Sequence, residues 1–443
     1  MAKRTAVNVV NAINNYIKKQ YNYQLPAVTA QNFSDMAGEL RLAPVAVQND
    51  WLDTLINLVG MQIVKNKRQY ESYFRKLHRN PIDTFDVQLV MIDLIKAKAF
   101  NPKADADDFF EDEPPRVGVQ YSNRVIKLKY PVSVNEESLY GAFISEGAFM
   151  DFLDAITVAL YSSMEMGDVE LTKELINKNI EEGNFRIVTC SKPVDKDTSL
   201  EFTQKLKKES ADMAVEMGPE SNLAGYNTFT PEGDGVIIST TEMSSVIETY
   251  SLPWAFDKNL LELRKEGQYI ETKSNGFADG KVFAVYADRD AFEIREITGF
   301  PKVTSQYFGN TLTQKRWLHY WGLYTISYFN NVVIFAASSD VGIASATLAA
   351  RDGSANVNRG EKKEIYVSAV TAASGKLADK FGTFAVTGNT DSDTYIDEYT
   401  GVLYVGKSET GTENTDEDMV LTVTWTSHLD STVTATIEIE VNQ

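Results

Sequence analysis

Two acidic stretches of the chain carry the oxygen ligands that calcium prefers. The first reads DADDFFEDE at residues 105–113, and the second reads DSDTYIDE at Asp391–Glu398. A calcium loop of the EF-hand type also needs a glycine at its sixth position and a bidentate glutamate at its twelfth. Neither stretch has both, so we expect two solvated loops rather than metal sites.

The other residues that could take part in catalysis or metal binding are isolated from one another. The three histidines, His78, His319 and His428, lie far apart in sequence, and Cys190 is the only cysteine. A single cysteine excludes an intramolecular disulfide. We expect His319 to be a packed residue and Cys190, within FRIVTC, to be a buried strand thiol. No phosphate-loop, dinucleotide, zinc-protease or nucleophile-elbow motif occurs. The sequence thus predicts no catalytic, cofactor or metal site and no enzyme.

An aromatic segment, Arg316 to Ser339, raises the question of a binding platform. It holds seven aromatic residues, including two of the five tryptophans. Exposed rings could stack on bases or sugars. Alternation of the side chains into a sheet core is the favoured interpretation. The pattern predicts a strand pair, with Asn330–Asn331 as the turn and VVIFAA as the returning strand.

Charge is distributed unevenly along the 443 residues. The formal net charge is −19, yet residues 1–80 carry eleven Lys and Arg against five Asp and Glu, a local charge of +6. The basic region could bind nucleic acid or an acidic protein, or it could simply be a solvated surface. No segment approaches the ~18 apolar residues of a membrane span. The first twenty residues lack the apolar core of a signal peptide, so we expect synthesis in a cytoplasm without classical export.

The elements that must hold these residues differ in character along the chain. Residues 1–64 indicate a helix and a loose arm, with Trp51, Leu55 and Leu58 at helical spacing. Residues 81–134 indicate an extended ribbon that lacks a core and must lie on something else to be stable. We expect the ribbon at 65–135 to pack on a neighbouring subunit rather than on its own chain. Residues 145–183 have the clearest helix pattern, with a kink at Gly167 and a second cap at Asp168.

The second half of the chain divides at residue 337. Residues 185–335 alternate strand and helix patterns and predict a mixed α/β region. From residue 338 onward, short apolar runs separated by Gly, Asp and Asn turns predict a small β-sandwich. The candidate strands are ATLAA, KEIYVSAV, GTFAVTG, VLYVG, VLTVTWTS and TATIEIEV.

Several short sequence motifs, in this order along the chain, resemble motifs of one known family. They are VQND before an aromatic residue at Val47–Trp51, GAF followed by FMDFLDAITVALYSS, VYADRDAF, and the Asn-Asn turn before VVIF. The chain resembles the major capsid proteins of small phi-29-like tailed phages. Near the carboxyl end, NVNRGEKKEIYVSAV and IDEYTGVLYV resemble a bacterial immunoglobulin-like domain of group 2.

The resemblance implies an α+β fold of the Hong Kong 97 type over residues 1–337, followed by an all-β immunoglobulin-like sandwich over residues 338–443. Within the first part it implies an amino-terminal arm (1–64), an E-loop (65–135), a spine helix (145–183) and an axial domain (218–310). The spine helix and the closing strands, residues 316–337, would belong to a peripheral domain.

The resemblance also implies a structural function. Many copies would self-assemble into pentamers and hexamers, forming an icosahedral shell around double-stranded DNA, and no membrane would be involved. Implied partners are a scaffolding protein and a portal during assembly, and packaged DNA on the inner face. The protein would be made in the bacterial host and end in the virion. The alternative is an exported adhesin or glycan-binding protein, because immunoglobulin-like sandwiches are common in that class.

Overall fold

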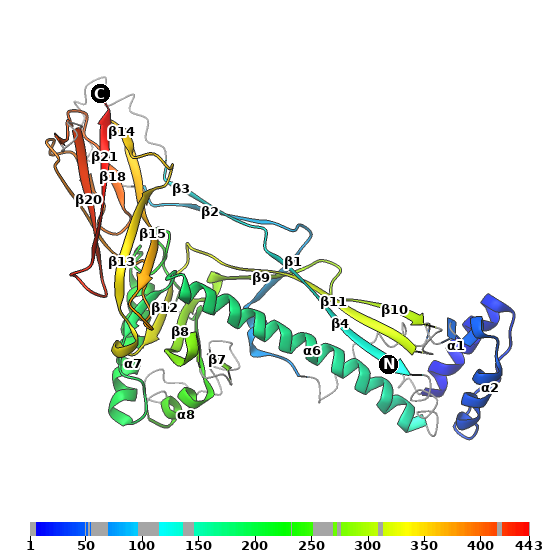
Figure 1. Ribbon diagram of the computed structural model, residues 1–443. Coiled ribbons are helices and arrows are strands. Elements are labelled where there is room, and N and C mark those ends of the chain that lie inside the picture. Colours follow the sequence, from blue (N-terminus) through cyan, green and yellow to red (C-terminus); the bar gives the residue numbers. More distant parts are fainter. Residues whose placement is uncertain are drawn as a thin grey trace.

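The structure is a computed structural model (Figure 1). One long helix runs through the body of the molecule. Helix α6, Glu146–Glu181, runs for 36 residues along one side of a twisted sheet. The ranges that the structure describes are 6–48, 50–51, 54, 70–95, 115–135, 146–231, 233–250, 269–272, 276–308, 313–413 and 419–442.

The expected kink at Gly167 and cap at Asp168 were wrong, because α6 continues through both. Gly167 instead gives space to a neighbour, since a β-carbon there would lie 2.1 Å from the hydroxyl of Tyr130. Asp168 is buried and accepts hydrogen bonds from other elements. The expected end is confirmed, because Gly183 has φ = 70°, a conformation that favours glycine.

The first sheet lies along α6. Its strand order is β1-β9-β11-β10, and β4 also pairs with β11. Alternation along β11 is confirmed in its middle, where Leu318 and Tyr320 are buried in the core that α6 completes. It is wrong near the end of the strand, where the adjacent Leu323 and Tyr324 are both buried. In β4, Lys127 and Lys129 are exposed on the opposite face, as expected. The strands are β1 (His78–Ile82), β4 (Val125–Asn135), β9 (Phe292–Ile297), β10 (Lys302–Phe308) and β11 (Thr313–Ile326).

The second sheet has the order β5-β12-β8-β6-β7. Helices α7 (Lys196–Val215) and α8 (Thr241–Tyr250) pack on one face of it through residues such as Phe202 and Met243. The carboxyl end of α6 packs on the other face through Ile176 and Ile180. The strands are β5 (Arg186–Thr189), β6 (Gly235–Thr240), β7 (Tyr269–Thr272), β8 (Val282–Asp288) and β12 (Val332–Ala336).

The expected pairing of the aromatic strand with VVIFAA was wrong, since β11 and β12 belong to different sheets. The cause lies at the turn between them. Asn331 is buried, accepts a hydrogen bond from Thr228 and donates one to Thr230, both at 3.2 Å. The Val332 N–H donates to the Ser221 carbonyl. These contacts redirect the chain into the second sheet.

The amino-terminal residues form a compact helical unit, so the expectation of a loose arm was wrong for residues 6–51. Helices α1 (Ala6–Tyr21) and α2 (Met36–Leu42) close around Trp51, which is fully buried and donates from Nε1 to Asn14 at 2.8 Å. Leu55, Leu58 and most of residues 52–69 lie outside the described residues. An apolar core stabilises this unit, and its members are Ala6, Val10, Ile13, Ile17, Leu25, Val28, Phe33, Met36, Leu40, Ala43, Val47 and Trp51.

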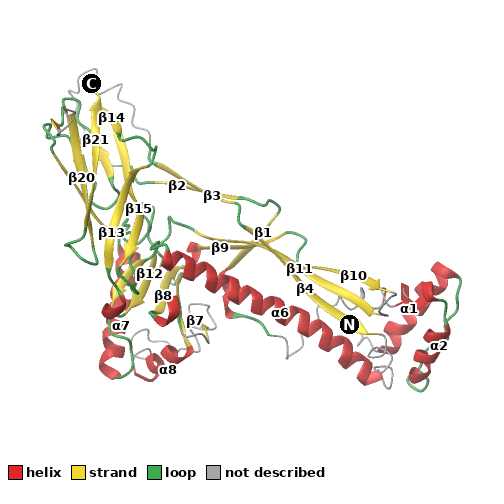
Figure 2. Ribbon diagram, viewed as in Figure 1, coloured by secondary structure: helices red, strands yellow, loops and turns green. Residues whose placement is uncertain are grey.

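A two-stranded ribbon, β2 (Val87–Ile92) and β3 (Val117–Ser122), runs from the body toward the sandwich (Figures 1 and 2). The expectation that it would not lie on its own chain was wrong for one face. The Gln120 amide donates to the Ile326 carbonyl at 2.8 Å and its oxygen accepts from the Tyr328 N–H at 2.9 Å. The acidic stretch at 105–113 lies outside the described residues.

Residues 343–442 form a two-sheet β-sandwich around Trp425, and each of the six expected strands is present. The strands are β13 (Ile343–Ala350), β14 (Asn356–Asn358), β15 (Lys362–Ala372), β16 (Gly382–Thr387), β17 (Tyr395–Ile396), β18 (Val402–Tyr404), β19 (Thr412–Glu413), β20 (Met419–Ser427) and β21 (Thr434–Asn442). Short 3₁₀ helices complete the chain: η1 (Phe33–Asp35), η2 (Tyr73–Leu77), η3 (Ala278–Gly280), η4 (Arg289–Ala291) and η5 (Ser338–Asp340).

Candidate subunit-contact surfaces

A buried polar network fastens the chain segment before the ribbon to the long helix. Asp168, 1% exposed, accepts a hydrogen bond from Tyr324 and lies 3.0 Å from Nε2 of His78. Glu165 of the same helix pairs with Arg75 at 3.2 Å. Burial raises the pKa of Tyr324, so its hydroxyl remains a proton donor to Asp168. Each of these groups holds another in place, and the network therefore serves structure rather than catalysis.

The ribbon has one apolar face that the described residues of its own chain leave exposed. Val90 and Val119 stand directly opposite each other, as do Ile92 and Val117. Their exposed fractions lie between 43% and 59%, and Tyr121 on the same face reaches 75%. A two-stranded ribbon with this much exposed apolar surface is typical of a contact site for another molecule. We call these five residues the ribbon face.

A second surface lies on the first sheet, on the side away from α6. The ammonium nitrogen of Lys127 lies 4.6 Å from the ring centre of Trp321, and the ammonium nitrogen of Lys129 lies 5.3 Å from the ring centre of Trp317. Phe300 stacks on Trp321 at 4.3 Å. No Asp or Glu occurs in the sequences of β4, β10 and β11. This basic aromatic face, as we call it, combines positive charge with apolar rings.

The favoured interpretation, side chains directed into a sheet core, is confirmed for part of the aromatic segment. The stacking platform for bases or sugars stays a prediction. The side chains of Leu318, Tyr320 and Tyr324 form core, whereas Trp317 and Trp321 lie on the partly exposed face. His319 shares that face, and its Nε2 lies 2.8 Å from the Thr304 hydroxyl. It is therefore a packed residue, as expected.

The second acidic stretch binds its own backbone. Asp391 accepts hydrogen bonds from the N–H groups of Asp393 and Ser408, at 3.0 Å each. Within the described residues no group of three His, Cys, Asp or Glu side chains could hold a metal ion. Cys190 is buried, and burial raises the pKa of its thiol to about 12, which keeps it unreactive.

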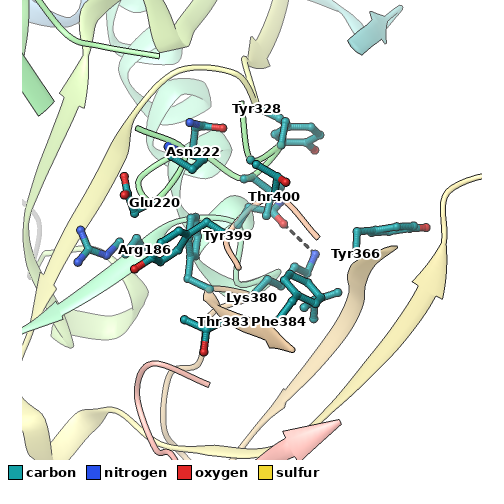
Figure 3. Close-up of a pocket in the computed structure, with 18 of the residues that line it drawn as sticks. Arg186, Glu220, Asn222, Tyr328, Tyr366, Lys380, Thr383, Phe384, Tyr399 and Thr400 are labelled. Carbon is teal, nitrogen blue, oxygen red and sulfur yellow. Dashed lines mark hydrogen bonds between the residues drawn. The ribbon is translucent and has the colours of Figure 1, made fainter. Parts of the chain in front are cut away.

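A cavity of about 420 Å³ lies between the sandwich and the body (Figure 3). Arg186, Glu220 and Asn222 line it from the body, and Lys380 and Tyr399 line it from the sandwich. Acidic, basic and aromatic groups mix in its wall, so the lining selects no single class of ligand. None of these residues was singled out from the sequence, because the pairing of two distant segments has no local pattern.

Comparison with known proteins places the chain in one class, the major capsid proteins of bacteriophages. The sequence profile described as Phi29-like phage major capsid protein matches residues 10–336. The major capsid protein of Bacillus phage GA-1 is 26% identical over 348 residues, covering 75% of this chain and 69% of the relative. That of Bacillus phage PZA is 24% identical over 372 residues, covering 83% and 81%.

Among solved structures, the capsid of Staphylococcus phage Andhra aligns with a TM-score of 0.48 and 13% identity, covering 62% of this chain and 87% of that one. A chain of Mycobacterium phage Che8 aligns with a TM-score of 0.37 and 12% identity, covering 62% and 94%.

The chain belongs to the Phi29-like phage major capsid protein family. Membership confirms the expected α+β capsid fold of the Hong Kong 97 type and a structural rather than enzymatic function in the virion. Copies of such a protein assemble with one another into a shell. The adhesin alternative finds no support in these relatives. No described helix is long and apolar enough to cross a membrane.

Proposed function

We propose that this chain forms pentamers and hexamers that close into an icosahedral shell around double-stranded DNA. The observation that carries the proposal is the ribbon face, which the described part of the chain leaves exposed. Covering it requires a second molecule, and neighbouring copies are always present in a shell. We place the arm at 1–64, the E-loop at 65–135, the spine helix at 145–183, the axial domain at 218–310 and an immunoglobulin-like sandwich at 338–443.

The basic aromatic face is a candidate contact for an acidic segment of a neighbouring copy. Residues 105–113 hold six acidic residues and two phenylalanines, which complement lysines and indole rings. The ends of β2 and β3 that adjoin this stretch in sequence lie near the sandwich, away from β10 and β4 (Figure 1). A contact between copies therefore suits the geometry.

The double variant Val90→Asp/Val119→Asp tests shell formation directly. It places two charges on the ribbon face, where burial against a neighbour would cost several kcal/mol per unpaired charge. We expect the yield of shells in electron micrographs to fall at least tenfold, with the circular dichroism of the unassembled chain unchanged. The matched control is Val194→Asp, at a site 66% exposed outside both faces.

Deletion of residues 104–112 should block assembly in the same way and leave a folded monomer. Normal shells from either the deletion or the double variant would exclude the proposed lattice contact.

We also propose scaffolding protein and portal as partners during assembly, and scaffolding protein or packaged DNA as the acidic partner of the basic region at 1–80. Lys65, Lys67 and Arg68 belong to it and lie outside the described residues. The Debye length falls from ~10 Å at 0.1 M salt to ~3 Å at 1 M, so contacts of exposed charges weaken with salt. Reversing these three charges should lower the assembly yield most at low salt. Salt-independent assembly that the triple variant leaves unchanged would indicate side chains that are merely solvated.

A further inference from the structure

Arg116, directly before β3, touches three separate parts of the molecule. One guanidinium nitrogen donates to the Asp93 carboxylate at 3.1 Å and to the Gly225 carbonyl at 2.6 Å. The other donates to the Ala224 carbonyl at 3.1 Å and to Glu364 at 2.6 Å. Asp93 follows β2, residues 224–225 belong to the body, and Glu364 belongs to strand β15 of the sandwich. The ribbon, body and sandwich therefore meet at one side chain.

The geometry around Arg116 is that of a specific joint. Its guanidinium lies 4.0 Å from the ring centre of Tyr226, and its side chain is 19% exposed. The second carboxylate oxygen of Asp93 accepts from the backbone and side-chain nitrogens of Asn227, at 3.1 and 2.9 Å. A planar guanidinium with several fixed acceptors holds direction as well as distance. Loss of one partner leaves a half-buried charge with an unmatched hydrogen-bond donor.

The sandwich has a second, independent attachment to the body. Asp379, 0% exposed, accepts a hydrogen bond from the Ile187 N–H of edge strand β5 at 2.7 Å. The Lys380 N–H donates to the Gly183 carbonyl at 3.0 Å, and its ammonium donates to Asn184 at 2.9 Å, drawn as a dashed line in Figure 3. The cavity described above separates this attachment from the Arg116 joint. Two separate attachment points restrict rotation in a way that one cannot.

We infer that the sandwich positions the end of the ribbon nearest the acidic stretch. Asp379 and Lys380 orient the sandwich on the body, and Glu364 then holds Arg116 from the sandwich side. Farther along β3, the two hydrogen bonds of Gln120 in the described part of the chain go to the body. The sandwich thus adds one contact, from Glu364, to the body contacts of Asp93 and Arg116 that fix where Ile95 and Pro115 lie, and this presentation of the ribbon face to a neighbour rests on the proposed function.

The test is hydrogen exchange of the unassembled full-length chain carrying Glu364→Ala. We expect amides at 91–95 and 116–119 to exchange about tenfold faster, with amides at 87–89 and 120–122 little changed. Arg116→Lys keeps the charge but loses the planar fork, and it should give the same pattern. The matched control is Arg351→Ala, which removes the more exposed partner of Glu364, 3.1 Å away, without touching Arg116.

Unchanged exchange at 91–95 and 116–119 in Glu364→Ala, with the sandwich amides still protected, overturns the inference. An equal increase in Arg351→Ala also overturns it, because the effect would then follow from any change around Glu364. The measurement needs no shells, so its outcome is separate from that of the assembly test. Shell formation that fails in the ribbon-face variant while exchange follows the expected pattern would support both proposals.

Discussion

The amino-terminal unit and the ribbon are stabilised in different ways. The sequence predicts a helix and a loose arm for the first and an extended ribbon without a core for the second. Residues 6–51 instead close around Trp51, whereas the ribbon buries one face on its own chain and leaves the other exposed. The difference lies in apolar density, since α1 and α2 bury a full cluster and β2–β3 have only alternate residues to bury. Regions with a core of their own can fold locally, and regions without one must lie on something else.

Expressing single regions of the chain in isolation tests this difference most directly. We expect residues 338–443, which have their own core, to be soluble and all-β by circular dichroism. Asp379 would lose Ile187 but keep His428 at 2.8 Å, so its carboxylate would still have a partner. A peptide of residues 86–123 should be unstructured. A disordered spectrum from a clean preparation of 338–443 would show that a local core is not sufficient.

Trp51→Ala tests the amino-terminal unit within the whole chain. Truncation of a fully buried tryptophan costs about 3–5 kcal/mol, and the Asn14 side chain would also lose a hydrogen-bond donor. We expect hydrogen exchange across α1 to rise strongly while β20 and β21 stay protected. Leu42→Ala, at an 81% exposed site on α2, is the control and should have almost no effect. Protection of α1 that survives Trp51→Ala would mean that α1 is stabilised from elsewhere.

Acid should lower the free energy of unfolding of the sandwich by protonating one carboxylate, that of Glu409. Burial raises the pKa of Glu409, but hydrogen bonds from Thr394, Thr390 and the Gly411 N–H outweigh it and lower the pKa to about 2. Because the folded pKa lies below the ordinary value, this stabilisation is complete above pH 4.5 and is lost as the pH falls toward 2. We expect a loss of about 2 kcal/mol after allowance for solvent screening.

The measurement is thermal unfolding of residues 338–443 between pH 6 and pH 2.5, followed by the fluorescence of Trp425, the single tryptophan of that segment. Glu409→Gln is the control, because it should be less stable at pH 6 and less sensitive to acid. Equal acid sensitivity in both proteins would assign the effect to other carboxylates.

Gly118→Ala should have the smallest effect and act on the ribbon alone. A β-carbon there would lie 2.6 Å from the Tyr226 hydroxyl and 2.7 Å from the Phe329 ring. Overpacking of this kind costs about 1 kcal/mol where side chains can shift. We expect faster amide exchange in β3, with α1 unchanged. Val119→Ala on the exposed face is the control, and an equal effect there would show that the inner face contributes no special contact.

The sequence by itself determined the local elements and the class of the protein. Alternation in β4, the apolar stripe of α6 and the regular turns of the sandwich depend on periodicities that neighbouring residues impose. The family resemblance likewise needed only the order of short words. It also determined that no catalytic constellation was to be expected, because the chemically active residue types are few and scattered.

Only the tertiary structure decided which distant segments meet. Asn331 sends β12 into a second sheet, Gly167 accommodates Tyr130 instead of bending α6, and Arg116 joins a ribbon to a domain that begins over two hundred residues later. Each of these contacts depends on partners far away in sequence, and a hydrogen bond or a close approach between such partners leaves no periodic trace in the chain. Local propensity therefore predicted the strands and helices, whereas long-range polar contacts determined how they are joined.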